Sequence, residues 1–156
     1  MENQKAIFAA GCFWGVERDF RKVKGVISTR VGYTGGEFRK PTYEDVCSHR
    51  SGHAEAIEII FDPSVVSYDE LLRVFWAIHN PTTLNRQGPD IGTQYRSAIF
   101  YLNQEQKEKA MKSKAKLEAS NQYKRPIVTQ IVPASDFWQA EEYHQNYIEK
   151  RNKKIS

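Results

Sequence analysis

The residue with the clearest chemical potential is Cys12, which lies in the run Gly11-Cys12-Phe13-Trp14-Gly15 near the N-terminus. An apolar strand is expected just before it, over residues 6–10, and a helix just after it, over residues 13–23. A cysteine at such a junction lies beside unpaired N–H groups and the positive end of the helix dipole, which favour the thiolate and lower the thiol pKa. The two glycines leave room for a close approach of backbone and substrate, and the two aromatic residues add a flat apolar surface beside the sulfur. These residues alone predict either a nucleophilic thiol next to an apolar pocket or a buried cysteine in an aromatic core.

The other residues that could bind a metal or act with a thiol are few. They are Cys47 and four histidines, His49, His53, His79 and His144. The histidines do not form a compact zinc-binding spacing with Cys47, so we expect no metal. Two cysteines are fewer than a secreted, disulfide-stapled protein normally carries, and the N-terminus lacks the features of a signal peptide. We therefore expect a cytoplasmic protein.

The length and charge of the chain narrow the class of protein further. The chain has 156 residues, 40% of them hydrophobic and 27% charged, with a net charge of +4. This composition predicts one globular domain over residues 1–156, with a basic and frayed tail from about residue 147. The lysines of residues 107–116 alternate with glutamates, as on the solvated face of a helix, and no nucleic-acid motif accompanies them. We expect neither nucleic-acid binding nor a membrane span, because no apolar run is long enough to cross a bilayer.

The elements that must position Cys12 alternate between strand and helix. Strands are expected over residues 6–10, 26–33, 54–61, 97–102 and 127–132. Helices are expected over residues 13–23, after Ser67, over residues 104–120 and over residues 136–150. The first six elements follow the split βαβ pattern, so we predict a two-layer α/β sandwich. It would have a ferredoxin-like βαββαβ core, a further helix, strand and helix, and a mixed or mostly antiparallel sheet. Two long irregular stretches, residues 34–51 and 82–96, are of the length that is often functional.

The run around Cys12 resembles the signature of the A-type peptide methionine sulfoxide reductases, and the likeness covers nearly the whole chain. The similar segments are residues 11–15, 32–36, 41–47, 52–56, 87–96 and 140–145. The resemblance implies reduction of the S epimer of methionine sulfoxide, in proteins or free, to methionine, with Cys12 left as a sulfenic acid.

The resemblance also implies a role for each residue around the sulfur. Cys12 would be the nucleophile and Glu55 the acid that protonates the sulfoxide oxygen, as a carboxyl with a raised pKa in an apolar site can do. The hydroxyls of Tyr43 and Tyr95 would hydrogen-bond that oxygen, and Asp90 would order the network. The aromatic pair Phe13 and Trp14 would hold the S-methyl group. Each residue also has a purely structural interpretation, such as a solvent-facing charge on a strand for Glu55 or a turn after Pro89 for Asp90.

The cysteines available to recycle Cys12 differ from a common pattern of the family. Many relatives carry a resolving cysteine in a glycine-rich C-terminal tail, whereas residues 147–156 contain no cysteine. Cys47 is the only other thiol, and we interpret it as a small side chain beside the site, although a disulfide with Cys12 stays possible if the loop over residues 34–51 moves. We expect an external thiol, thioredoxin or glutathione with glutaredoxin, to attack the sulfenic acid of a monomeric enzyme that has no other cofactor.

Two alternatives from other classes stay open at this point. One is a thiol hydrolase in which His144 or His53 is the base for Cys12. The other is a non-catalytic module that binds methionine-like side chains on the aromatic surface around Trp14.

Overall fold

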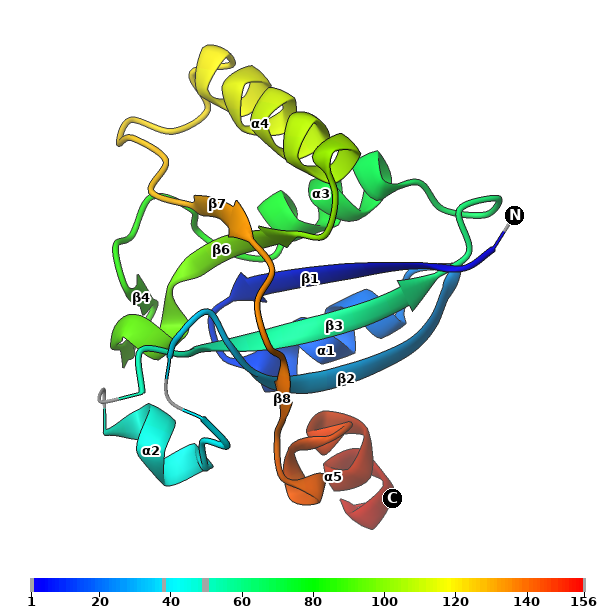
Figure 1. Ribbon diagram of the computed structural model, residues 1–156, viewed down its shortest axis with the longest axis vertical. Coiled ribbons are helices and arrows are strands. Elements are labelled where there is room, and N and C mark those ends of the chain that lie inside the picture. Colours follow the sequence, from blue (N-terminus) through cyan, green and yellow to red (C-terminus); the bar gives the residue numbers. More distant parts are fainter. Residues whose placement is uncertain (1, 38, 49–50, 156) are drawn as a thin grey trace.

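The computed structural model describes residues 2–37, 39–48 and 51–155. Its main sheet has six strands in the order β7-β6-β1-β3-β2-β8 (Figure 1). They are β1 (Gln4–Ala10), β2 (Val26–Thr34), β3 (Ala54–Phe61), β6 (Ser97–Tyr101), β7 (Gln130–Pro133) and β8 (Trp138–Gln139). The strands β4 (Arg86–Gln87) and β5 (Asp90–Ile91) form a separate short hairpin.

The helices are α1 (Phe13–Arg21), α2 (Tyr43–Cys47), α3 (Tyr68–Ala77), α4 (Gln104–Ala119) and α5 (Tyr147–Ile155), with 3-10 turns η1 (Thr93–Tyr95) and η2 (Glu142–His144). The four strands β6-β1-β3-β2 are antiparallel, and α1 and α3 connect them as in a ferredoxin-like βαββαβ core. β7 joins one edge in parallel and β8 joins the other edge antiparallel. The predicted two-layer α/β sandwich with a mixed, mostly antiparallel sheet is confirmed.

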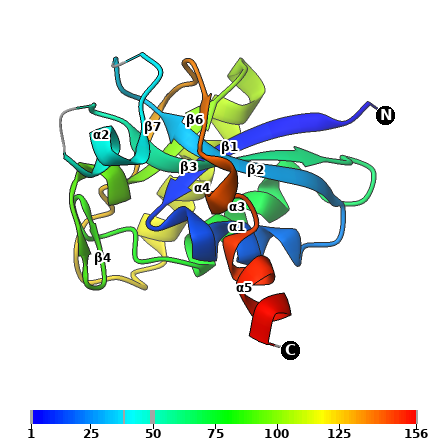
Figure 2. The same ribbon diagram turned by 90° about the horizontal axis from the view of Figure 1, so that it is seen from below.

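Large apolar side chains fill the space between the sheet and the helices. Figures 1 and 2 show α1 and α3 on one face of the sheet. Phe8 of β1 lies at the centre of this layer, because its ring is 5.4 Å from that of Phe20, 5.9 Å from that of Tyr68 and 5.2 Å from that of Phe75. α4 is attached to α3 by a hydrogen bond of 2.7 Å from the Trp76 indole to the Ser113 hydroxyl.

The opposite face of the sheet is covered by extended chain rather than by a helix. The segment from β7 to β8 crosses in front of β1 and β3 (Figure 1). Small side chains allow this close crossing, since four of the six buried residues there are alanines, namely Ala9, Ala54, Ala56 and Ala98. Gly32 of β2 is required at the end of the crossing, because a Cβ atom there would lie 2.5 Å from the ring of Phe137.

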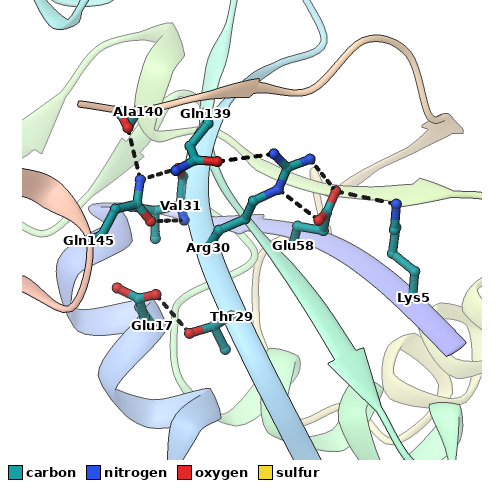
Figure 3. A network of polar contacts seen from close by, with 9 residues as sticks. All are labelled: Lys5, Glu17, Thr29, Arg30, Val31, Glu58, Gln139, Ala140 and Gln145. Atoms are coloured by element: carbon teal, nitrogen blue, oxygen red, sulfur yellow. Dashed lines mark hydrogen bonds and ion pairs between the residues drawn. The ribbon is translucent and has the colours of Figure 1, made fainter. Parts of the chain in front are cut away.

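The last quarter of the chain corrects one prediction. The sequence predicts a single helix over residues 136–150, but the structure has β8, η2 and then α5 from Tyr147 onward, where a frayed tail is expected. Hydrogen bonds attach this segment to β2: Ala140 N–H donates to the carbonyl of Val31. The Gln145 side chain bonds both the N–H and the carbonyl of Val31 (Figure 3). Asn146, with φ of +54°, then ends this segment before the helix begins.

The two irregular stretches contain more regular structure than the sequence indicates. Within residues 34–51, α2 is started by Thr42, whose hydroxyl accepts from Asp45 N–H while the Asp45 carboxylate accepts from Thr42 N–H. Within residues 82–96 lie the β4–β5 hairpin and η1. Among the helices in the described part of the chain, none is long and apolar enough to cross a bilayer.

Candidate active site

Cys12 lies at the strand–helix junction that the sequence predicts. β1 ends at Ala10, α1 begins at Phe13, and Cys12 is the N-cap residue, whose side chain makes no capping hydrogen bond. Gly11 is required here, because its φ is +99° and a Cβ atom would lie 2.8 Å from the Gln87 side chain. A Cβ atom at Gly15, in the first turn of α1, would meet only the end of the Arg18 side chain, at 3.8 Å, among the side chains described.

The protonation state of Cys12 is the opposite of the sequence prediction. Burial and the charge of Glu55 raise the pKa of the thiol to about 11, and Asp90 adds to this effect. The backbone N–H groups of Trp14 and Gly15 lower the pKa, as the helix terminus should, but they are outweighed. Cys12 therefore rests as a thiol at neutral pH.

Glu55 is a buried carboxyl that forms no ion pair with any residue the structure describes. It projects from β3, is 2% exposed, and accepts one hydrogen bond of 3.3 Å at Oε1 from the N–H of Phe13. Its Oε2 atom has no hydrogen-bond partner among the described residues. Burial raises the pKa of Glu55 to about 8, a change that the Phe13 N–H opposes and the charge of Asp90 reinforces. The side chain adjoining Cys12 is thus a carboxylic acid that holds its proton at pH 7.

Glu58, three residues further along β3, provides the contrast. It lies on the other face of the sheet and forms hydrogen-bonded ion pairs of 2.7 and 3.0 Å with Arg30, together with an ion pair of 3.6 Å with Lys5 (Figure 3). Two cations pair with Glu58, whereas Glu55 pairs with none among residues 2–37, 39–48 and 51–155, so of these two carboxyls Glu55 is the one arranged as a proton donor.

Tyr95 and Asp90 both lie near Cys12 and Glu55. Tyr95 is the last residue of η1 and is half-buried; burial raises its pKa to about 12, followed by the charges of Glu55, Cys47, Asp90 and Cys12. Asp90 begins β5, and its charge acts on the thiol, the carboxyl and the phenol. The structure therefore brings these residues, predicted from three distant segments, into one cluster.

Tyr43 and Cys47 lie one turn apart on α2 and contact each other. Burial, followed by the neighbouring Cys47 side chain, raises the pKa of Tyr43. Burial also raises the pKa of Cys47, against an opposing effect of Tyr43. Both cysteines are free thiols.

The two aromatic residues after Cys12 have different surroundings. The Phe13 ring is 1% exposed and packs between Tyr33, at 5.8 Å, and His144, at 5.1 Å. Trp14 is half-buried, stacks on Tyr147 at 3.9 Å, and donates its indole N–H to His144 Nδ1 at 2.9 Å. Trp14 therefore keeps part of its surface exposed, whereas Phe13 lies in the core.

One residue of the site, Glu141, is not singled out by the sequence. Glu141 accepts a hydrogen bond of 2.9 Å from the Tyr33 hydroxyl and one of 3.1 Å from the N–H of Tyr43, so it attaches α2 to β2. The only sequence signal for Glu141 is its place in the family-like segment over residues 140–145. His53, in another such segment, accepts from the N–H of Gly36 at 3.1 Å. In the described part of the chain, no group of three or more His, Cys, Asp or Glu side chains could hold a metal ion.

The protonated Cys12 thiol and the protonated Glu55 carboxyl lie close together at one end of a ferredoxin-like sheet, with Tyr95 and Trp14 nearby. This arrangement is typical of a thiol-dependent enzyme. The family model for peptide methionine sulfoxide reductase matches residues 4–156. The chain belongs to the peptide methionine sulfoxide reductase family.

Relatives and solved structures agree with this membership. The chain is 64% identical to a peptide methionine sulfoxide reductase, MsrA, of Methanosarcina acetivorans over 95% of the chain and 79% of the relative. It is 61% identical to MsrA of Geobacter metallireducens over 96% and 93%. Yeast Mxr1 in its reduced form has 36% identity and a TM-score of 0.91, with 97% of this chain and 87% of that one covered. Methionine sulfoxide reduction is thus the activity of this chain, in place of the hydrolase and binding-module alternatives.

Proposed function

We propose that Cys12 and Glu55 together reduce the S epimer of methionine sulfoxide, in oxidised proteins or as the free amino acid, to methionine. The observation that carries this assignment is the pair of raised pKa values: burial keeps both the Cys12 thiol and the Glu55 carboxyl protonated at neutral pH. The Phe13 N–H that binds Glu55 also belongs to the first turn of α1, which follows Cys12 directly. This link holds the acid close to the sulfur.

The proposed reaction conserves protons at the site. Glu55 gives its proton to the sulfoxide oxygen while the Cys12 sulfur bonds to the sulfoxide sulfur, and the resulting carboxylate takes the thiol proton. The hydroxyl then moves to the Cys12 sulfur as the S–S and S–O bonds of the substrate break, and methionine leaves. The substrate sulfur gains two electrons, the Cys12 sulfur loses two and becomes a sulfenic acid, and Glu55 ends protonated.

The surrounding residues bind and orient the substrate in this proposal. The hydroxyls of Tyr43 and Tyr95 donate to the sulfoxide oxygen, and Asp90 helps to order them. The exposed side of the Trp14 ring takes the S-methyl group, with Phe13 behind it. Oxygen, methyl and attacking sulfur then fix three directions around the chiral sulfur, which selects one epimer.

An external thiol returns Cys12 to its reduced form. A solved structure of yeast Mxr1 in complex with Trx2, 26% identical to this chain with a TM-score of 0.66, supports a thioredoxin as that reductant, and glutathione with glutaredoxin has the same chemistry. Cys47 is a free thiol at the end of α2, and we propose that it takes no part in recycling. Two unpaired cysteines suit a reducing, cytoplasmic compartment, and we propose that one domain acts there as a monomer.

A single-turnover experiment tests the proposal. The reduced protein is mixed with one equivalent of a peptide that contains methionine S-sulfoxide, without reductant, then treated with a sulfenic-acid probe and mapped by mass spectrometry. We expect the loss of one thiol, the probe on Cys12 and one equivalent of methionine. Two lost thiols and a Cys12–Cys47 linked peptide would refute the recycling route, and an unmodified Cys12 with sulfoxide consumed would refute the nucleophile.

A further inference from the structure

The indole of Trp14 is held by residues from the other end of the chain. Tyr147 stacks on it at 3.9 Å with an angle of 13° between the rings, and His144 accepts its N–H at 2.9 Å. Two further contacts keep this segment on the same face of α1: Glu17 accepts from the N–H of Asn146 at 2.6 Å, and Arg21 pairs with Glu149 at 2.7 Å. Trp14, Glu17 and Arg21 are spaced along one side of the helix, so the segment follows α1 for two turns.

The protonation of His144 follows from its partner. An indole nitrogen can only donate, so His144 Nδ1 must be the unprotonated acceptor and Nε2 must carry the hydrogen. Burial lowers the pKa of His144, which favours this neutral ring. Its Nε2 atom is buried and has no hydrogen-bond partner in the part of the chain that the structure describes. A donor left unsatisfied costs about 1–3 kcal/mol, a cost that a ring with only a packing role could avoid by being apolar.

The orientation of His144 is fixed on several sides. Its ring lies 5.1 Å from that of Phe13, 4.6 Å from that of Tyr43 and 4.0 Å from that of Tyr143, and the residue is fully buried. A ring packed in this way keeps Nδ1 in one place. The His144 nitrogen that accepts the hydrogen bond from Trp14 is therefore held in a fixed position.

We propose that His144 is the positioning residue for Trp14: its Nδ1 atom sets the orientation of the indole wall that receives the S-methyl group, and so the preference for one epimer. This inference rests on the proposed function, in which Trp14 binds that methyl group. His144 touches neither substrate nor the reacting sulfur, and acts only through the indole.

Two substitutions separate the hydrogen bond from the packing. His144→Phe keeps a ring of similar size and removes the acceptor, whereas His144→Asn loses the ring but offers a carbonyl oxygen near the place of Nδ1. For His144→Phe we expect KM for the S-sulfoxide to rise about tenfold, with a smaller change in kcat, as for loss of a binding contact worth ~1.4 kcal/mol. We expect the ratio of S to R turnover to fall as well, and His144→Asn to recover most of both losses.

A second readout needs no turnover. With 15N-labelled tryptophan, the Trp14 indole signal, assigned by its loss in Trp14→Phe, should exchange its proton slowly with solvent in the wild type and in His144→Asn, but fast in His144→Phe. If the Phe variant does not fold, His144→Leu replaces it. A His144→Phe or Leu protein with wild-type KM, epimer ratio and indole exchange would overturn the inference. A wild type that reduces no sulfoxide would instead refute the proposed function, while the indole exchange still tests the contact.

Discussion

Glu55→Gln separates the supply of a proton from the other properties of the site. Glutamine has nearly the shape of a protonated glutamate and can still accept the hydrogen bond from Phe13 N–H, but it has no acidic proton. Because the pKa of Glu55 is about 8, about ten carboxyls are protonated for each one ionised at pH 7. The substitution therefore removes a proton donor that nearly every wild-type molecule holds. General acid catalysis contributes ~10²–10⁴-fold, so we expect kcat for sulfoxide reduction to fall by that factor.

The same substitution should make the nucleophile more acidic. The charge of Glu55 is the second cause of the raised pKa of Cys12, after burial, so removing the carboxylate lowers the thiol pKa below about 11. The pH dependence of Cys12 alkylation by iodoacetamide, read from the Cys12 peptide, measures this change. A better-ionised thiol together with slower turnover would identify Glu55 as the acid, because a mere distortion of the site would not produce both.

The matched control is Glu58→Gln on the same strand. It removes another buried carboxylate, on the opposite face, and we expect kcat within about twofold of wild type, since Glu58 is paired with Arg30 away from Cys12. Wild-type kcat should also decline as the pH rises through about 8, where Glu55 loses its proton, and this decline should be missing in Glu55→Gln. Reduction by Glu55→Gln at more than a tenth of the wild-type rate between pH 6 and 7 would refute the reasoning.

Three further predictions use other residues. Cys12→Ser should keep its circular dichroism and melting temperature but lose turnover with dithiothreitol supplied; substantial residual activity would remove Cys12 as the nucleophile. Trp14→Ala should raise KM more than it changes the pH profile of Cys12 alkylation, and a wild type that consumes both epimers equally would contradict this role. His79, whose pKa burial lowers to about 4, is neutral when folded, so protonation below pH 6.5 favours the unfolded chain. Urea unfolding should reveal stability lost from pH 6.5 down to 4, by up to about 3 kcal/mol, and His79→Gln should weaken this slope; an unchanged slope would refute it.

Sequence patterns predict the core of the fold because they report local preferences that agree with the tertiary structure. The βαββαβ order follows from apolar periodicity, and Asn103 caps α4 as expected, with its side chain accepting from Gln106 N–H. The prediction of one helix over residues 136–150 is wrong for a physical reason. Its polar backbone groups are satisfied by β2 and by the side chain of Gln145, and a partner that distant leaves no periodic signal.

The sequence likewise predicts one part of the site and misses another. The position of Cys12 follows from its own neighbours, but the direction of its pKa change does not, because burial and the charge of Glu55 come from elements that fold around it. The helix terminus does lower the thiol pKa, as the local sequence predicts, but this effect is smaller than those of burial and Glu55. The resemblance to a family predicts which residues gather around Cys12, while only the structure reveals that Glu141 connects Tyr33 to α2.

The attachment of β8 to β2 has a consequence for how the protein folds. The Val31–Gln145 hydrogen bond joins residues 114 positions apart, and the segment from β8 to the start of α5 contains Glu141, His144 and Tyr147. Contacts of such long range form late, because the entropy of closing the intervening loop must be overcome first. During synthesis, a ribosome would release this segment after all the strands it joins. A growing chain would therefore hold a folded ferredoxin-like core and a Cys12 thiol before it had a finished methyl-binding wall. In refolding, we expect the near-ultraviolet signal of Trp14 to appear in the slowest phase, after the sheet has formed.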